Sequence, residues 1–251
     1  MTFHNVAAII PARYASTRFP GKPLVKIMGL PMIQRVYQQV TQSGIEKVMV
    51  ATDDERIARV VKDFGGEVIM TNPNHSTGTD RLAEAAQQLS CEWILNVQGD
   101  EPVISPDDLN NLVETTMATG ECPISTLIFP ITEETHFNNP NVVKVVLNQN
   151  NHALYFSRAA IPFPRNPPQS MWKHLGIYFY RKDFLLAFSQ WPQAQLESTE
   201  SLEQLRILER GYPILCVPAK FEGIGVDHPD DILKVERFLM NNSPKTKETP
   251  A

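Results

Sequence analysis

Short apolar runs alternate with segments of helical periodicity through the first half of the chain. Strands are predicted at residues 6–10, 47–52, 67–70 and 93–98, and helices at 32–40, 57–64 and 79–89 and from residue 105. A run such as V-A-A-I-I, apolar at every position, is typical of a strand buried on both faces of a parallel sheet. The alternation therefore predicts an α/β fold with a doubly wound, mostly parallel sheet and right-handed crossovers.

The second half of the chain has a different pattern. Strands at residues 142–147 and 153–156 flank the polar turn N-Q-N-N and predict an antiparallel hairpin. A strand at 174–180 and a helix at 182–190 follow. One continuous helix is then predicted from about 196 to 210, before a strand at 214–217 and a closing helix at 230–240. We expect the hairpin to form a small antiparallel lobe that shares the sheet of the first half.

The loop after the first predicted strand is rich in cations. Arg13, Arg18 and Lys22 lie within residues 12–23, which contain no acid but do contain two hydroxyl residues and a glycine. Ligands of open α/β sheets bind at the carboxyl edge of the strands, and Arg and Lys form charge-assisted hydrogen bonds to phosphate oxygens. The loop suits a polyphosphate, and a solvated basic loop is the alternative. Walker A and Rossmann glycine patterns are missing, which disfavours P-loop enzymes and NAD-linked dehydrogenases.

Two acids are candidate metal ligands. Asp100 follows the predicted fourth strand in V-Q-G-D-E-P, at the edge where the basic loop is expected. Magnesium prefers carboxylates combined with substrate phosphate oxygens, so we favour a metal ligand over a turn-capping residue here. Asp227 follows two glycines in G-I-G-V-D and precedes a helix start. From the residues alone, metal ligation and helix capping are equally open for Asp227.

Further polar residues suggest where a substrate would lie. The hydroxyl-rich stretch S-T-G-T-D-R, residues 76–81, begins a predicted helix and suits either a nucleobase edge or a simple helix cap. On the predicted strand at 174–180, His174, Gly176 and Tyr178 share one face, and the glycine leaves space between the two rings. This arrangement resembles the floor of a pocket, although a satisfied core position is the usual place for a single His or Tyr.

Composition excludes several classes of function. The net charge of −5 and pI of about 5.7 disfavour a nucleic-acid partner, which usually requires a basic surface. No apolar run approaches the roughly 20 residues that span a bilayer, and no secretion signal is recognisable. Three widely spaced cysteines form neither a disulfide framework nor a zinc pattern. We therefore expect a cytoplasmic protein without membrane insertion.

Taken together, the motifs resemble one enzyme family. They are I-P-A-R-Y-A-S-T-R-F-P-G-K-P, A-T-D-D, S-T-G-T-D-R, N-V-Q-G-D-E-P, N-P-N-V-V-K-V-V, A-L-Y-F-S-R-A-A-I-P, H-L-G-I-Y, L-E-Q-L-R and G-V-D-H-P-D-D-I. In this order, over roughly residues 5–240, they resemble the 3-deoxy-manno-octulosonate (Kdo) cytidylyltransferases. The resemblance implies a fold of the nucleotide-diphospho-sugar transferase type and a cytoplasmic, magnesium-dependent homodimer. It also implies synthesis of CMP-Kdo from CTP and Kdo for lipopolysaccharide biosynthesis, with pyrophosphate released.

The resemblance also implies a domain organisation and roles for individual residues. A single domain is expected over residues 1–240, with a CTP-binding half to about 130, a sugar-binding and dimerisation part at about 131–220, and a disordered tail at 241–251. The residues expected to bind CTP are Ala12, Arg13, Arg18, Lys22, Ser76, Gly78 and Arg81. Those expected to bind Kdo are Gln98, Arg158, His174, Tyr178, Glu203 and Gln204. Asp100 and Asp227 are expected to hold Mg²⁺, and with Lys22 and Arg13 they form the expected catalytic set.

The implied chemistry is an in-line displacement. The anomeric 2-hydroxyl of Kdo attacks the α-phosphorus of CTP, and no covalent enzyme intermediate is needed. One alternative is the same reaction on 8-amino-Kdo or a sialic acid. A second, from another class, is a nucleotide-sensing module without turnover, which would keep the basic loop but would not need the paired carboxylates Asp100 and Asp227.

Overall fold

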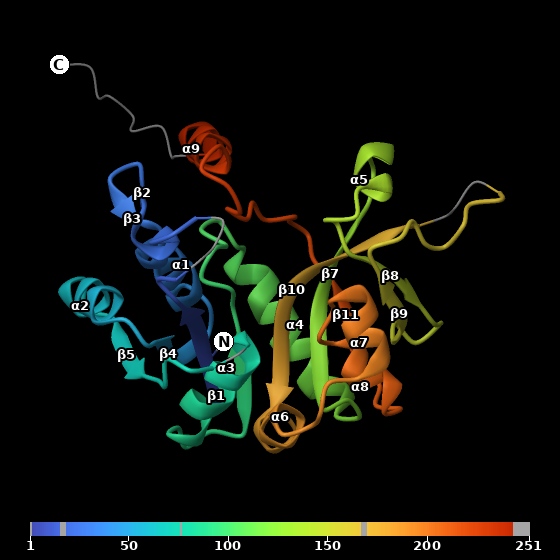
Figure 1. Ribbon diagram of the computed structural model, residues 1–251, viewed down its shortest axis with the longest axis horizontal. Coiled ribbons are helices and arrows are strands. Elements are labelled where there is room, and N and C mark those ends of the chain that lie inside the picture. Colours follow the sequence, from blue (N-terminus) through green and yellow to red (C-terminus); the bar gives the residue numbers. More distant parts are fainter. Residues whose placement is uncertain (1, 16–18, 76, 167–169, 243–251) are drawn as a thin grey trace.

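A single mixed sheet runs through the molecule (Figure 1). The computed structural model describes residues 2–15, 19–75, 77–166 and 170–242. Within these residues the sheet has nine strands in the order β11-β7-β10-β6-β1-β4-β5, with β8 paired to β10 and β9 paired to β8. Its strands are β1 (Phe3–Ala12), β4 (Ile45–Thr52), β5 (Glu67–Met70), β6 (Trp93–Asn96), β7 (Ile124–Pro130), β8 (Lys144–Leu147), β9 (Ala153–Ser157), β10 (Trp172–Arg181) and β11 (Leu215–Pro218).

The predicted doubly wound sheet is confirmed. β1 is an interior strand that pairs in parallel with β4 on one side and with β6 on the other. Residues 7–10 of β1 are fully buried, as the unbroken apolar run predicts. The predicted hairpin is also confirmed as β8 and β9, and Figure 1 shows this lobe on the side of the molecule opposite α2. β10 is antiparallel to both β6 and β7, so it joins the parallel half of the sheet to the lobe.

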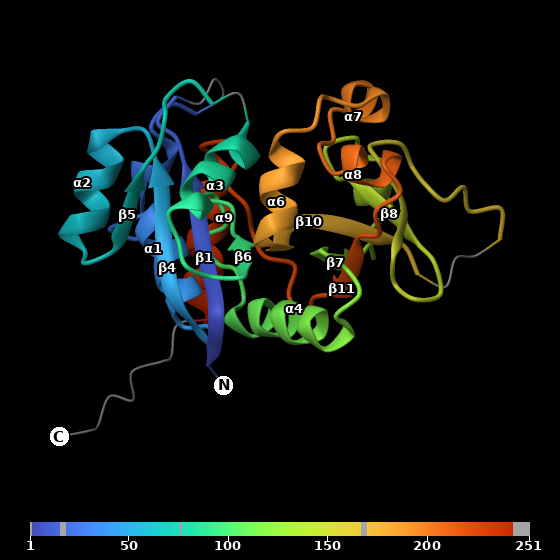
Figure 2. The same ribbon diagram turned by 90° about the horizontal axis from the view of Figure 1, so that it is seen from below.

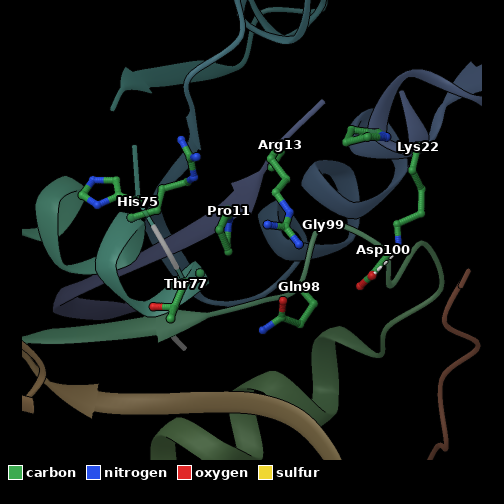
Figure 3. A pocket seen from close by; sticks show the side chains of 12 residues that line it. Pro11, Arg13, Lys22, His75, Thr77, Gln98, Gly99 and Asp100 are labelled. Carbon is green, nitrogen blue, oxygen red and sulfur yellow. Dashed lines mark hydrogen bonds and ion pairs between the residues drawn. The ribbon is translucent and has the colours of Figure 1, made fainter. Parts of the chain in front are cut away.

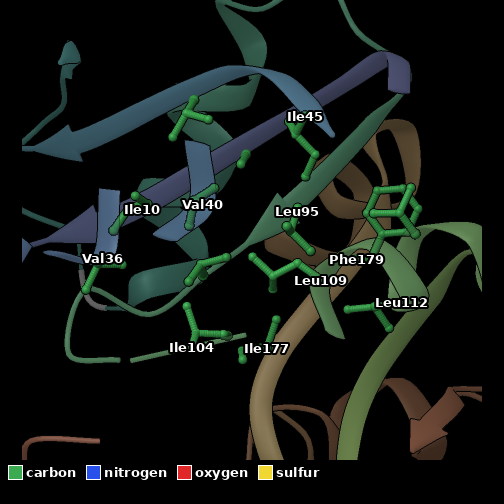
Figure 4. Close-up of a cluster of buried hydrophobic side chains, with 14 of the residues drawn as sticks. Ile10, Val36, Val40, Ile45, Leu95, Ile104, Leu109, Leu112, Ile177 and Phe179 are labelled. Carbon is green, nitrogen blue, oxygen red and sulfur yellow. The ribbon is translucent and has the colours of Figure 1, made fainter. Parts of the chain in front are cut away.

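Helices cover both faces of the sheet. Those described are α1 (Met32–Thr41), α2 (Glu55–Asp63), α3 (Gly78–Gln87), α4 (Pro106–Thr119), α5 (Glu134–Asn138), α6 (Lys182–Ser189), α7 (Gln195–Glu200), α8 (Leu205–Glu209) and α9 (Asp231–Asn242), besides the short 3₁₀ helix η1 (Lys22–Leu24). One core packs α1, α2 and α4 against the sheet (Figure 4). The second packs α3, α6 and α8 on the opposite face (Figure 2).

A third, smaller cluster lies beyond the carboxyl edge of the sheet. It joins the small ribbon of β2 (Lys26–Ile27) and β3 (Leu30–Pro31) to α9 through Ile27, Val226 and Val235. Figure 1 shows α9 above this ribbon. The segment that leads into α9, which contains Asp227, is thereby held near the loop that leaves β1.

The structure corrects three predictions of local structure. The continuous helix at 196–210 is wrong: the chain breaks between α7 and α8, where Ser201 adopts a left-handed φ of 53°. The regular strand face at 174–178 is interrupted at Gly176, whose φ is 71°, and the ring centroids of His174 and Tyr178 lie only 5.1 Å apart, so no space separates them. Residues 241 and 242, predicted to belong to the tail, are part of α9; residues 243–251 lie outside the described part.

The structure also contains elements that the sequence did not indicate. These are β7, α5 and the β2–β3 ribbon. None of the described helices has the length and apolar character needed to cross a membrane.

Candidate active site

A cavity of about 310 Å³ opens at the carboxyl edge of β1 and β6 (Figure 3). Four segments line it: the end of β1, the start of η1, the N-terminus of α3 with the loop before it, and the turn after β6. The lining residues are Pro11, Ala12, Arg13, Lys22, Pro23, His75, Thr77, Gly78, Arg81, Gln98, Gly99 and Asp100. The basic loop, the hydroxyl-rich loop and the V-Q-G-D turn therefore meet at one edge, as expected for parallel strands.

A close backbone approach forms the floor of the cavity. A Cβ atom added to Gly99 would lie 2.9 Å from the carbonyl oxygen of Pro11, which is too short for a side chain. The turn after β6 therefore needs glycine in order to lie against the end of β1. Figure 3 shows the Arg13 side chain extending from β1 towards this turn, so its guanidinium can meet an anion bound there.

Lys22 and Asp100 form an ion pair at one end of the cavity. The Lys22 Nζ lies 2.6 Å from Asp100 Oδ2 and also donates to the carbonyl oxygen of Val226 at 2.8 Å. The backbone of Asp100 is tied to the same segment, because the amide of Val226 donates to the Asp100 carbonyl oxygen at 2.9 Å. Asp227, the next residue, is therefore held beside the Asp100 turn.

The carboxyl group of Glu101 lies close to those of Asp100 and Asp227. Burial, the largest effect, and the charges of Asp100 and Asp227 raise the pKa of Glu101 to about 8. Two glycines make room for it: a Cβ atom on Gly225 would lie 2.9 Å from Glu101 Oε1, and one on Gly223 would lie 3.2 Å from Oε2. Both glycines of the G-I-G-V-D segment therefore pack against the Glu101 carboxyl group.

The N-terminus of α3 forms the opposite wall. Thr77 caps the helix, accepting from the amide of Asp80, while Asp80 accepts from the amide of Thr77. Arg81 is buried, and its Nη1 donates to Thr71 Oγ1 at 2.5 Å and lies 3.1 Å from Asp53 Oδ1. That carboxylate oxygen is not aligned for a hydrogen bond and has no other partner in the described structure. Arg81 is thus fixed by two anchors on the β4 side.

Most residues expected to bind the sugar lie on the α3–α6 side of the sheet. Glu203 accepts from Thr79 Oγ1 at 2.5 Å and lies 3.2 Å from Arg206 Nη2. Burial raises the pKa of Glu203, and these two contacts lower it in part. Burial, with the nearby Glu203 charge, also raises the pKa of Tyr178 well above its ordinary value. Glu203 is therefore hydrogen-bonded to the start of α3, and its charge acts on Tyr178 of β10.

Gln204 and His174 show two different environments on this side. Gln204 is buried, and its Nε2 has no hydrogen-bond partner in the described structure. The His174 Nε2 accepts from the amide of Gly176 at 3.3 Å and lies 3.0 Å from Thr126 Oγ1. Burial lowers the pKa of His174 to about 3, so the ring is neutral. Gln98 joins this region to the cavity by donating to the Gly176 carbonyl oxygen at 3.4 Å.

Arg158 lies apart from the cavity, at the end of β9. Its guanidinium donates to backbone carbonyl oxygens of Glu200, Pro140 and Ser201 at 2.8–3.4 Å. The carboxylate of Glu200 receives the Arg158 amide and the Ser157 hydroxyl. Arg158 thus fixes the carbonyl end of α7 to the lobe.

Comparison with known proteins identifies the family. A family model described as cytidylyltransferase matches residues 7–219. A 3-deoxy-manno-octulosonate cytidylyltransferase of Syntrophotalea carbinolica is 50% identical over 246 residues, which cover 94% of this chain and 98% of the relative. The chain belongs to the 3-deoxy-manno-octulosonate cytidylyltransferase family. A relative of the same name from Parabacteroides distasonis is 48% identical over 246 residues, covering 93% of this chain and 97% of the relative.

Solved structures agree with the family. The structure of CMP:2-keto-3-deoxy-manno-octonic acid synthetase complexed with CTP superposes with a TM-score of 0.90 at 43% identity, covering 94% of this chain and 98% of that chain. A 4-diphosphocytidyl-2C-methyl-D-erythritol synthase from Anaerococcus prevotii superposes with a TM-score of 0.62 at 13% identity, covering 94% of this chain and 98% of that chain, and shows the fold alone. The predicted family and the predicted fold class are both confirmed.

The cavity of this cytidylyltransferase gathers part of the predicted site. The predicted residues that line it are Ala12, Arg13, Lys22, Gly78, Arg81, Gln98 and Asp100. Asp227, Arg158, His174, Tyr178, Glu203 and Gln204 lie outside its lining. Arg18 and Ser76 lie outside the described residues. The functional roles of all these residues remain predictions.

Some residues of the site were missed from the sequence. His75 and Thr77 line the cavity. Thr77 lies inside the S-T-G-T-D-R motif but was not singled out, and His75 directly precedes the motif, so extending it by one residue would have included His75. Glu101 was missed as well. Glu101, the acid of G-D-E-P, packs against two glycines that come more than a hundred positions later in the sequence. Only the fold brings these segments together, so the sequence alone does not single it out.

Proposed function

We propose that this chain transfers CMP from CTP to Kdo, releasing pyrophosphate and supplying CMP-Kdo for lipopolysaccharide biosynthesis. The observation that carries the proposal is the cavity at the carboxyl edge of β1 and β6, where Arg13, Lys22 and Asp100 converge. Two cations and a carboxylate at one edge suit a metal-bound triphosphate. Relatives at about half identity carry the corresponding enzyme name, and the similar solved structure was determined with CTP.

The reaction is an in-line displacement at the α-phosphorus. The anomeric 2-hydroxyl of Kdo attacks, and the bond to pyrophosphate breaks. Negative charge grows on the leaving oxygens in the transition state, so fixed cations at that position lower the barrier. Arg13 and Lys22 would hold the leaving pyrophosphate, and Ala12 and Gly78 would border the nucleoside. Arg18 and Ser76, outside the described residues, complete the proposed CTP site.

Mg²⁺ is the proposed cofactor, and Asp100 and Asp227 are its proposed ligands. The fit is supported by the Asp100 carboxylate, which already holds a cation, the Lys22 ammonium, at 2.6 Å. A second support is that the charges of Asp100 and Asp227 both raise the pKa of Glu101, as expected for two carboxylates close to the same group. When bound, the metal would supply positive charge to substrate phosphate oxygens. Among the described residues no group of three or more Asp, Glu, His or Cys side chains is arranged to hold a metal.

The sugar is proposed to bind on the α3–α6 side, next to the cavity. Gln98, His174, Tyr178, Glu203 and Gln204 form the proposed contacts. The unpaired Nε2 of buried Gln204 supports this position, because it offers a donor that the described protein does not use. Arg158 is proposed to pair with the Kdo carboxylate, which requires its guanidinium to leave at least one carbonyl partner. Arg158→Ala should then raise the sugar KM without a matching change in the CTP KM.

We further propose a cytoplasmic homodimer that uses the β8–β9 lobe. Leu154 in β9 is 61% exposed and Phe163 in the connection to β10 is 86% exposed, so both offer apolar contact area. β9 pairs along its length with β8, and on its other edge the Ala153 amide, at the start of the strand, donates to Ile214 at 2.9 Å, so the later part of this edge could take part in an interface. Light scattering of the wild-type protein and of Leu154→Glu would test this surface, and a dimeric variant would refute it.

The test of the proposed activity is pyrophosphate release. Each of the four nucleoside triphosphates is supplied with magnesium and with Kdo, 8-amino-Kdo or N-acetylneuraminate. Release with CTP and Kdo alone is the expected result. Release with CTP and another sugar would support the proposed reaction but show that Kdo is not its sugar substrate. Binding of CTP without release from any pair would replace the enzyme by a nucleotide-sensing module.

A further inference from the structure

Asn96 carries an unexplained polar atom. It is the last residue of β6, only 4% exposed, and its Oδ1 has no hydrogen-bond partner in the described structure. Burying an unpaired carbonyl oxygen destabilises a protein, and more than nine in ten buried polar groups are paired. Asn96 does not line the cavity itself, but it lies two residues before Gln98, which does, so its open acceptor is expected to have a use when substrate is bound.

The strand pattern shows which way Asn96 faces. On β6, Leu95 belongs to the core beneath α1 and α4, whereas Ile94 belongs to the core beneath α3 and α6. Side chains alternate along a strand, so Asn96 lies on the same face as Ile94. Its register partner on the antiparallel strand β10 is Tyr178, and such partners have their Cβ atoms about 5 Å apart.

A complementary unpaired atom lies on the same face. The Nε2 of Gln204 is buried without a partner, and the next residue, Leu205, packs in the core beneath α3 and α6. Glu203 connects Gln204 to Thr79 at the start of α3, and the Glu203 charge also affects the pKa of Tyr178. The side of the sheet beneath α3 and α6 thus contains an open acceptor on β6, a phenol on β10 and an open donor on the residue before α8.

We propose that Asn96 is a specificity-determining residue of the sugar site, where its Oδ1 accepts a hydrogen bond from a hydroxyl of the acidic sugar. A hydroxyl both donates and accepts, so a polyhydroxylated ligand can satisfy Asn96 and Gln204 together. A site built to pair a substrate hydroxyl discriminates strongly against analogues that lack it. The inference rests on the proposed function, because it assigns a residue to the sugar of that reaction.

Asn96→Leu separates recognition of the sugar from stability. Leu has a similar size and removes an unpaired polar atom, so the free protein should keep or raise its melting temperature. The sugar KM should rise about 10- to 100-fold, while the CTP KM should stay within about twofold. If Leu does not fit the site, Asn96→Ala gives the same kinetic comparison with a smaller side chain.

Ser125→Ala provides the matched control. Ser125 is fully buried on β7, which β10 separates from β6, but its hydroxyl is paired with Thr116 Oγ1 at 2.5 Å. This variant should lose stability and leave both KM values unchanged. An Asn96 variant with an unchanged sugar KM, or one that behaves like Ser125→Ala, would overturn the proposal and point to a structural role or a buried water. If the wild-type enzyme does not turn over Kdo, the proposed function itself fails, and the role of Asn96 fails with it.

Discussion

In the ligand-free protein, Lys22 and a divalent cation would compete for one carboxylate. The Lys22 Nζ lies 2.6 Å from Asp100 Oδ2, and the two side chains are only 14% and 33% exposed. Replacing Lys22 by Met keeps much of the stem and removes the charge. Lys22→Met should therefore bind Mn²⁺, a probe for the proposed Mg²⁺ site, more tightly than the wild-type protein when CTP is absent.

The size of this effect follows from the ion pair that the metal must displace. A hydrogen bond between charged groups contributes about 1.5–3 kcal/mol, and solvent near the open cavity favours the lower end. A gain of about 1.4 kcal/mol corresponds to tenfold tighter Mn²⁺ binding. With CTP present, Lys22→Met should instead bind Mn²⁺ more weakly than the wild-type protein, because the variant lacks a cation for the triphosphate. Its turnover should also fall steeply.

Titration calorimetry with Mn²⁺, with and without CTP, measures both effects. Lys26→Met is the matched control, since Lys26 is exposed on β2 and should leave metal binding unchanged. If Lys22→Met bound Mn²⁺ no more tightly than the wild-type protein does, Lys22 and the metal would not share Asp100, and the proposed metal site would have to be placed elsewhere.

Three further predictions follow from other contacts. Asp100→Asn should lower pyrophosphate release by about 100-fold or more with an unchanged circular dichroism spectrum; an active, metal-independent variant would contradict the metal role. Arg206→Met removes the partner of the buried Glu197 carboxylate, whose Oε1 lies 2.5 Å from Arg206 Nη2. Arg206→Met should lower the free energy of unfolding, measured in urea, by about 3–5 kcal/mol, and the double variant Arg206→Met/Glu197→Leu should recover most of this loss. A loss below about 1 kcal/mol in the single variant would show that the ion pair does not stabilise the fold. Because folding lowers the pKa of His174 to about 3, the unfolded chain binds a proton that the folded chain does not as pH falls below about 6.5. As pH falls through that window, His174 should therefore lower the free energy of unfolding by up to about 1.4 kcal/mol per pH unit, and His174→Gln should make stability depend less on pH. Equal pH slopes for the wild-type protein and the variant would exclude a neutral, buried His174.

The meeting of the basic loop and the acidic turn could be predicted from the sequence. Arg13 and Lys22 follow one buried apolar run, and Asp100 follows another. When two such runs are parallel strands of one sheet, their carboxyl ends lie at the same edge. Local pattern and topology were therefore enough to bring these three residues together, and the described cavity contains all of them.

Contacts between segments distant in the sequence could not be predicted in this way. The packing of Gly223 and Gly225 against Glu101 depends on the path of a loop, which no periodicity reports. The position of β10 between β6 and β7 depends on long-range strand pairing. For the same reason the open Oδ1 of Asn96 could not be anticipated, because an unpaired atom is defined only when every neighbour is known.

The wrong helix prediction concerns the residues of the proposed sugar site directly. Residues 196–210 have good helical periodicity, and a continuous helix would satisfy their backbone within the segment. Instead the left-handed Ser201 ends α7, its carbonyl and that of Glu200 accept from Arg158, and Glu203 reaches Thr79 on α3. A non-glycine residue with positive φ is unfavourable and persists where the surrounding structure fixes it. The break between α7 and α8 therefore lets Glu203 reach Thr79 of α3 and lets Arg158 hold the end of α7 against the lobe, next to the proposed sugar contacts Glu203 and Gln204.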